Sequence, residues 1–183
     1  MLTPTLKASA PSRVIIVSSA AENAAPPSGV AYDSWRPASQ PADYEDGTAY
    51  GQSKLSNLLT AKEAAVRFEG SGVTAYSLHP GVIETNLATD MVTYMESRPQ
   101  SQAAKVAGAM MMGFFSTALF KRADGALTQL HLATADVADL ENGAFYHPIG
   151  KVAVPEHVKG VDAALQKELW DETEKAIASV KSN

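Results

Sequence analysis

The sequence has 183 residues, 45% of them hydrophobic and 19% charged, which suits one globular domain with a sizeable core. Its formal net charge of -5 argues against the basic surface that a nucleic-acid backbone needs, so we expect no nucleic-acid partner. The absence of cysteine excludes disulfides, zinc–thiolate sites and a thiol nucleophile, and it fits a cytoplasmic protein.

The first predicted strand is the β-branched run Arg13–Val17, which ends at two hydroxyl residues, Ser18 and Ser19. A short apolar run without polar alternation is typical of a parallel strand that is buried on both faces. Residues 2–10 resemble the last turn of a preceding helix. Between residues 20 and 46, four prolines exclude a long helix, and we predict a loop there.

The clearest predicted helix covers Thr48–Glu69, where Leu, Ala, Lys and Glu dominate. The run Gly70–Gly72 ends that helix. A second strand is predicted at Val73–Leu78, and the sequence His79-Pro80-Gly81 ends it. The chain therefore brings a strand, a helix and a second strand into succession.

A mostly helical region is predicted from about Leu87 to Ala135, followed by a short third strand at Gly143–Tyr146. A final helix is expected at about Val161–Val180, with Leu165, Leu169, Trp170 and Ile177 as its inward-facing residues. This order of elements predicts a parallel α/β sheet in a single domain, residues 1–183. The longest apolar stretch, Val106–Phe120, is shorter than the ~20 residues that span a bilayer, so no transmembrane segment is expected.

Residues able to do chemistry follow the ends of the first two strands. Ligands of an open parallel sheet lie beyond the carboxyl ends of its strands, where Ser19 and Pro80-Gly81 are placed. Tyr50 and Lys54 are four residues apart and share one helix face. A phenol ionises near pH 10, and a neighbouring ammonium group lowers that pKa, which suits a tyrosine for acid–base work.

The segments 13–19, 49–57 and 78–85 together resemble the short-chain dehydrogenase/reductase family, and its retinol-dehydrogenase-like branch in particular. Segments 142–146 and 169–175 are similar to the end of that branch. The resemblance implies a Rossmann-type, doubly wound parallel sheet. It also implies an oxidoreductase that interconverts an alcohol and a carbonyl with NADP or NAD, NADP being favoured, on a small lipophilic substrate.

The resemblance also implies roles for individual residues. Tyr50 would be the general acid and base, and Lys54 would hold the nicotinamide ribose and lower the pKa of Tyr50. Ser19 would orient the substrate oxygen, with Ser18 as the less favoured choice. The expected nicotinamide contacts are Pro80, Gly81, Ile83 and Thr85.

No glycine-rich pyrophosphate-binding pattern occurs in the sequence. We therefore expect a partial sheet that lacks its first strands, with the N-terminal dinucleotide-binding half absent and the C-terminal catalytic half present. The alternative function is an inactive fragment that pairs with a full-length relative. The unpaired edge of the first strand would make the isolated chain oligomeric or poorly soluble.

Three further questions stay open. The methionines and phenylalanines between residues 91 and 120 form either a substrate lid, or ordinary core or a surface that meets the missing half. Leu55, Leu59 and Val66 form either the face of a homodimer through the Tyr50–Lys54 helix or part of the core. No metal site is expected, because the four histidines lack ligand spacing.

Overall fold

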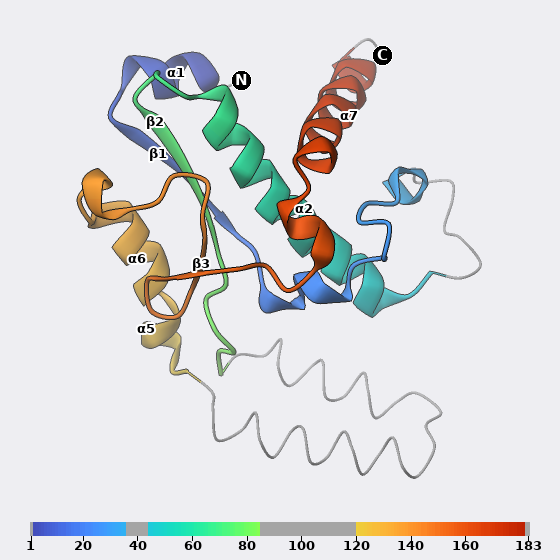
Figure 1. Ribbon diagram of the computed structural model, residues 1–183, viewed down its shortest axis with the longest axis horizontal. Helices are drawn as coiled ribbons and strands as arrows, with labels where there is room; N and C mark the ends of the chain where they lie inside the picture. The colour runs from blue at the N-terminus through green and yellow to red at the C-terminus, as the bar shows by residue number, and fades with distance from the viewer. Residues whose placement is uncertain (1, 36–43, 85–119, 182–183) are drawn as a thin grey trace.

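The computed structural model describes residues 2–35, 44–84 and 120–181, which form a sheet with helices on both sides (Figure 1). The sheet has four strands in the order β1-β2-β3-β4. Strand β1 (Ser12–Val17) pairs in parallel with β2 (Val73–Leu78), and β2 pairs in parallel with β3 (Phe145–His147). The predicted α/β class and its mostly parallel sheet are confirmed.

The sheet has one strand more than the three that the sequence predicts. A fourth strand, β4 (Lys151–Ala153), pairs antiparallel with β3, with Tyr146 opposite Val152. The sequence offered little signal for it, since a strand of three residues is too short to show a hydrophobic period. The connection between β3 and β4 is short, so the two strands form a hairpin. Strands joined this way pair antiparallel, whereas parallel strands would need a longer crossover connection.

The helices follow the predicted order with small shifts at their ends. They are α1 (Thr3–Ala8), α2 (Asp46–Arg67), α5 (Arg122–Gly125), α6 (Leu127–Thr134) and α7 (Ala163–Lys181). Short 3-10 turns are η1 (Ala20–Ala24), η2 (Tyr32–Trp35), η3 (Val137–Asp139) and η4 (Val158–Val161). In the described part of the proline-rich segment 20–46, η1 and η2 are the helical elements that precede α2, so no long helix forms there, as predicted.

Helices α2 and α7 lie on one side of the sheet, and α5 and α6 lie on the other (Figure 1). Strand β1 therefore alternates between two apolar cores. Val14 packs against the Ala64–Phe68 cluster of α2, whereas Ile15 packs against the cluster that holds Leu132 of α6. Covering both faces explains why this strand has no polar alternation.

Helix α2 provides most of the core on its side of the sheet. The carboxylate of Glu45 accepts a hydrogen bond from the Thr48 amide at 2.8 Å and caps its first turn. Leu55 and Leu59 are fully buried in one core cluster with Leu165 and Leu169 of α7. These two leucines therefore belong to the core, and neither is available for a dimer face.

Helix α7 docks through its first half only. Leu165 and Leu169 are buried as predicted, and Trp170 packs partly against the α2 cluster. The prediction that Ile177 faces inward is wrong, because its side chain is 40% exposed. The last turns of α7 extend away from the sheet, where no described element covers them (Figure 1).

Candidate functional site

The candidate site lies where β1 and β2 end side by side. The strands stay in register to Val17 opposite Leu78, and the Ser18 amide then donates to the Leu78 carbonyl at 2.7 Å. On the other side of β2, the His79 amide donates a hydrogen bond to the Tyr146 carbonyl of β3 at 2.8 Å. Ser19 and Pro80 thus follow the carboxyl ends of adjacent strands, as the sequence predicts.

The two serines have different environments. Ser18 is 2% exposed, and its hydroxyl donates to the Lys54 carbonyl at 2.6 Å. Ser19 is half-buried, and its hydroxyl oxygen accepts a hydrogen bond from the Ala21 amide at 3.1 Å as the cap of η1. The Ser19 hydroxyl still has its proton to donate, so Ser19 is the serine better suited to meet a ligand.

Tyr50 and Lys54 lie together on α2, as their spacing predicts. The Lys54 ammonium stands 5.3 Å from the centre of the Tyr50 ring. This separation allows a cation–π contact. Tyr50 is 42% exposed, so its phenol is open to a ligand. The helix thus presents a hydroxyl and a cation on one accessible face.

The turn after β2 has the backbone shape that glycine permits. Gly81 has a φ of +96°, and a Cβ there would lie 2.7 Å from the Phe120 ring. Phe120 is also bonded to this turn through its backbone, because its amide donates a hydrogen bond to the Val82 carbonyl at 2.8 Å. The Ile83 side chain packs against Gly125 of α5, where an added Cβ would lie 2.5 Å from its Cδ1.

The structure brings some of the predicted residues together and leaves others apart. Tyr50 contacts Lys54, and Ser18 joins Lys54 to the end of β1, directly before Ser19. Within the described residues, no hydrogen bond links Ser19 directly to Tyr50 or to the Pro80–Ile83 turn. Thr85 and the methionine-rich segment up to residue 119 lie outside the described residues, so their predicted roles stay predictions.

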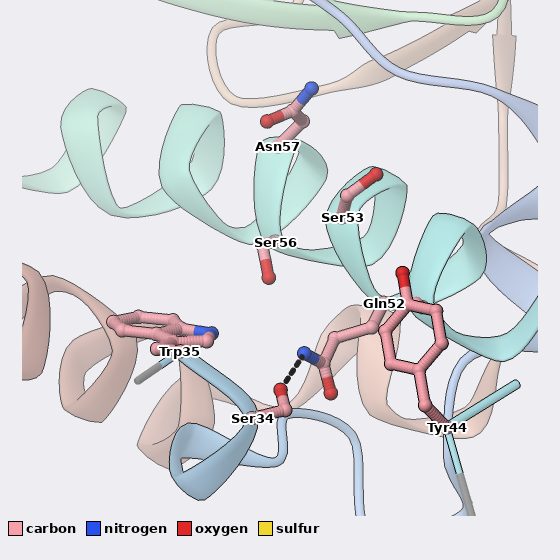
Figure 2. A pocket seen from close by; sticks show the side chains of 8 residues that line it. Ser34, Trp35, Tyr44, Gln52, Ser53, Ser56 and Asn57 are labelled. Atoms are coloured by element: carbon pink, nitrogen blue, oxygen red, sulfur yellow. Dashed lines mark hydrogen bonds between the residues drawn. The ribbon is translucent and has the colours of Figure 1, made fainter. Parts of the chain in front are cut away.

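A pocket of about 370 Å³ lies between the first half of α2 and the residues Trp35 and Tyr44 (Figure 2). Its walls combine the rings of Trp35 and Tyr44 with amide and hydroxyl groups, and Gln52 donates to the Ser34 hydroxyl across its floor at 3.1 Å. The full lining is Ser34, Trp35, Tyr44, Ala49, Gln52, Ser53, Ser56 and Asn57. None of the predicted catalytic residues, Ser19, Tyr50 and Lys54, lines this pocket.

Sequence reasoning missed a buried carboxylate beside the site. Glu22 is fully buried, and its carboxylate accepts hydrogen bonds from the amides of Glu156 at 2.6 Å and His157 at 3.2 Å. Burial raises the pKa of Glu22, and the two amides oppose that shift. This carboxylate fastens η1, which follows Ser19, to the segment after β4. A single Glu in a loop gives no sequence signal for such a tie.

Two histidines also meet at this edge. The rings of His79 and His147 are 5.3 Å apart and edge-to-face. Burial, followed by the neighbouring His147, lowers the pKa of His79 to about 4. Burial also lowers the pKa of His147. Both rings are therefore neutral at physiological pH and hold no charge beside the Pro80–Gly81 turn.

Within residues 2–35, 44–84 and 120–181, no three His, Asp or Glu side chains are grouped so that they could hold a metal ion. The helices of these ranges include none with the length and hydropathy that crossing a bilayer requires.

Known proteins resemble this chain over nearly all of its length. Mouse retinol dehydrogenase 13 is 31% identical over 180 residues, which cover 97% of this chain and 48% of that protein. Mouse retinol dehydrogenase 14 is 29% identical over 96% of this chain and 47% of its own length. The chain thus spans about half the length of the curated relatives it matches.

A solved structure of an uncharacterised protein from Mycobacterium paratuberculosis is also similar. It is 28% identical, with a TM-score of 0.56 over 90% of this chain and 49% of that one. No family model matches the chain. The likeness in sequence and in fold therefore covers about half of each of these longer proteins.

Proposed function

Because the chain is a homologue of the retinol dehydrogenases, which are short-chain dehydrogenase/reductases, we propose that it carries the catalytic half of an NAD(P)-dependent oxidoreductase. The proposed reaction interconverts an alcohol and a carbonyl. The observation that carries the proposal is the Lys54 ammonium, 5.3 Å from the exposed Tyr50 ring, on the helix that Ser18 fastens to the strand end before Ser19.

In the direction of reduction, the Tyr50 hydroxyl gives its proton to the substrate oxygen as the carbonyl carbon accepts a hydride. The Tyr50 phenolate that remains is stabilised by the adjacent Lys54 ammonium. The Ser19 hydroxyl donates to the same substrate oxygen and orients it, while the Ala21 amide holds the Ser19 oxygen in place. In the direction of oxidation, the phenolate takes the proton back.

The residues at the sheet edge fit the nicotinamide end of the cofactor. Tyr50 and Lys54 offer hydrogen-bond donors to ribose hydroxyls from an accessible helix face. The positive φ of Gly81 turns the backbone directly after β2, at the strand end where the proposed nicotinamide contacts begin. Bound NAD(P) supplies or accepts the hydride. The preference for NADP over NAD is part of the proposal.

Three finer expectations belong to the proposal as well. A lipophilic substrate fits the Phe120 ring, which lies against Gly81 beside the proposed nicotinamide contacts. A homodimer through the Tyr50–Lys54 helix would now rest on Val66, which is 58% exposed, since Leu55 and Leu59 are in the core. A cytoplasmic location fits the absence of cysteine.

The decisive test is calorimetric titration of the 183-residue chain with NADPH and with NADH, followed by assay of aldehyde reduction. We expect saturable binding that weakens at least about tenfold, ~1.4 kcal/mol, in Lys54→Ala. Tyr50→Phe should keep binding within about threefold and lose about 10²–10⁴-fold in turnover, because the proton donor is gone. Lys62→Ala, on the same helix and away from the sheet edge, is the control and should match the wild type.

A folded chain that binds neither nucleotide would contradict this proposal. The open edge of β1 favours a second candidate, a fragment that acts by pairing with a full-length relative, because no described strand pairs with the other side of β1. Under that alternative, the chain would bind the relative, and Tyr50→Phe and Lys54→Ala would bind it equally well.

A further inference from the structure

We propose that Ser18 and Asn57 are positioning residues that together fix the Tyr50–Lys54 helix against the end of β1. This inference rests on the proposed function, because its consequence is the alignment of Tyr50 with Ser19. Neither residue is expected to touch substrate or cofactor.

The two residues make a reciprocal pair of hydrogen bonds between α2 and β1. The Ser18 hydroxyl, on the strand side, donates to the Lys54 carbonyl of the helix at 2.6 Å. The Asn57 amide, on the helix side, donates to the Val17 carbonyl of the strand at 3.0 Å. Val17 and Ser18 are neighbours, and Lys54 and Asn57 are one turn apart, so the two bonds lie next to each other.

Directional contacts are needed here because apolar packing alone does not fix a helix along its own axis. Leu55, Leu58 and Leu59 hold α2 to the sheet through the hydrophobic effect, which is non-directional. Within the described ranges, the other side-chain hydrogen bonds from α2 reach elsewhere. Gln52 accepts from the Ala31 amide at 2.8 Å, and Arg67 pairs with Asp171 of α7 at 2.8 Å. Among the described residues, Ser18 and Asn57 alone join the helix to the end of β1 by side-chain hydrogen bonds.

Their location makes them relevant to the reaction. Ser18 directly precedes Ser19, and the carbonyl it holds belongs to Lys54, one turn after Tyr50. A movement of α2 along β1 would change the separation of the Tyr50 phenol from the Ser19 hydroxyl. The internal Tyr50–Lys54 contact would survive, since both residues are on the helix. A misplacement of about 1 Å can cost roughly 10²-fold in rate.

The kinetic test compares Ser18→Ala and Asn57→Asp with the wild type in NADPH-dependent reduction of decanal. Asn57→Asp keeps the shape of the side chain and lacks the N–H donor. We expect kcat to fall about 10- to 100-fold with KM for decanal within about threefold, because alignment and not binding is lost. Gln52→Ala is the matched control: it removes hydrogen bonds from the same helix that do not reach β1, and its kcat should stay within about twofold of the wild type.

A second readout needs no nucleotide. Since the chain has no cysteine, cysteines that replace the exposed residues Val66 on α2 and Val152 on β4 can carry the only two spin labels. We expect the label-to-label distance distribution to broaden or shift in Ser18→Ala and Asn57→Asp, and to stay unchanged in Gln52→Ala.

The two readouts separate the inference from the proposed function. An unchanged distance distribution in both variants would overturn the positioning role, whatever the kinetics. An active wild type whose kcat is unaffected by both substitutions would overturn it too. A wild type that never reduces decanal nor binds NADPH would refute the proposed function alone, and the distances would still decide whether Ser18 and Asn57 hold the helix.

Discussion

His79 shows how the environment of one residue at the sheet edge couples to stability. Burial and the nearby His147 ring lower its pKa to about 4, from the 6.5 of a free histidine. Between these two values, the unfolded chain binds a proton at His79 that the folded chain does not bind. The free energy of unfolding must therefore fall as the pH drops from about 6.5 to about 4.

We predict that His79→Gln removes part of this pH dependence, which urea denaturation at pH 7, 6, 5 and 4 would measure. Over this pH range, the free energy of unfolding should fall by about 1–2 kcal/mol more in the wild type than in His79→Gln. The difference is smaller than the full pKa shift implies, because solvent screens a partly exposed group. His147 contributes with the same sign, because its pKa is also lowered. Glu22 opposes it, because its pKa is raised and its protonation favours the folded state at low pH. Parallel pH profiles for the variant and the wild type would contradict the prediction.

Some features of the site could be predicted from the sequence and others could not. The spacing of Tyr50 and Lys54 fixes their common face within one helix, so the sequence alone sufficed. The separate environments of Ser18 and Ser19 depend on where α2 crosses the strand end, which is tertiary information. The tie from Glu22 to the segment after β4 spans more than 130 positions and has no local signal.

Among the elements, α2 and η1 approach each other unusually closely, and Gly51 allows it. A Cβ at this position would lie 2.6 Å from the backbone of Ala24 and Ala25. Backbone atoms cannot move aside as a flexible side chain can, so α2 or η1 would have to shift. Because η1 begins directly after Ser19, the shift would also disturb the proposed site.

We predict that Gly51→Ala destabilises the fold by about 1–3 kcal/mol through overpacking, even though alanine favours the helix. Gly47→Ala on the same helix is the matched control. Its added Cβ meets only the flexible carboxylate of Glu45, at 3.1 Å, so this change should be neutral or stabilising. Thermal unfolding of the two variants measures whether stability falls in Gly51→Ala and is kept or rises in Gly47→Ala. Equal changes in stability would contradict the prediction, because helix propensity alone would then account for both.

Long elements with a clear period were predictable, and short ones were not. The predicted strand Val73–Leu78 agrees with β2, and the predicted helix at Thr48–Glu69 differs from α2 by two residues at each end. The three-residue β4 escaped notice, and with it the antiparallel edge of the sheet. The inward position expected for Ile177 failed because helical spacing continues after the neighbouring elements end.

At the scale of the whole molecule, the sheet has an uneven boundary. At one edge β4 is short, and at the other β1 has six residues, with no described strand on its outer side. The β1 side chains Val14, Ile15 and Ile16 are only half-buried, although their sequence is typical of a fully covered strand. The mismatch between an apolar strand and its partial burial marks this edge as a place where another strand can pair.

We predict that the isolated chain associates through β1 at tens of micromolar, which light scattering across a dilution series would measure. Val17, 42% exposed near the end of the strand, is the position to test: Val17→Lys places a charge on the edge and should shift the chain toward monomer. Val66→Lys, on the exposed face of α2, separates this route from the dimer through the helix: it should leave association through β1 unchanged and weaken only a dimer that forms through α2. A wild type that is monomeric throughout would contradict the prediction. Association abolished by Val66→Lys but not by Val17→Lys would assign the contact to α2 instead.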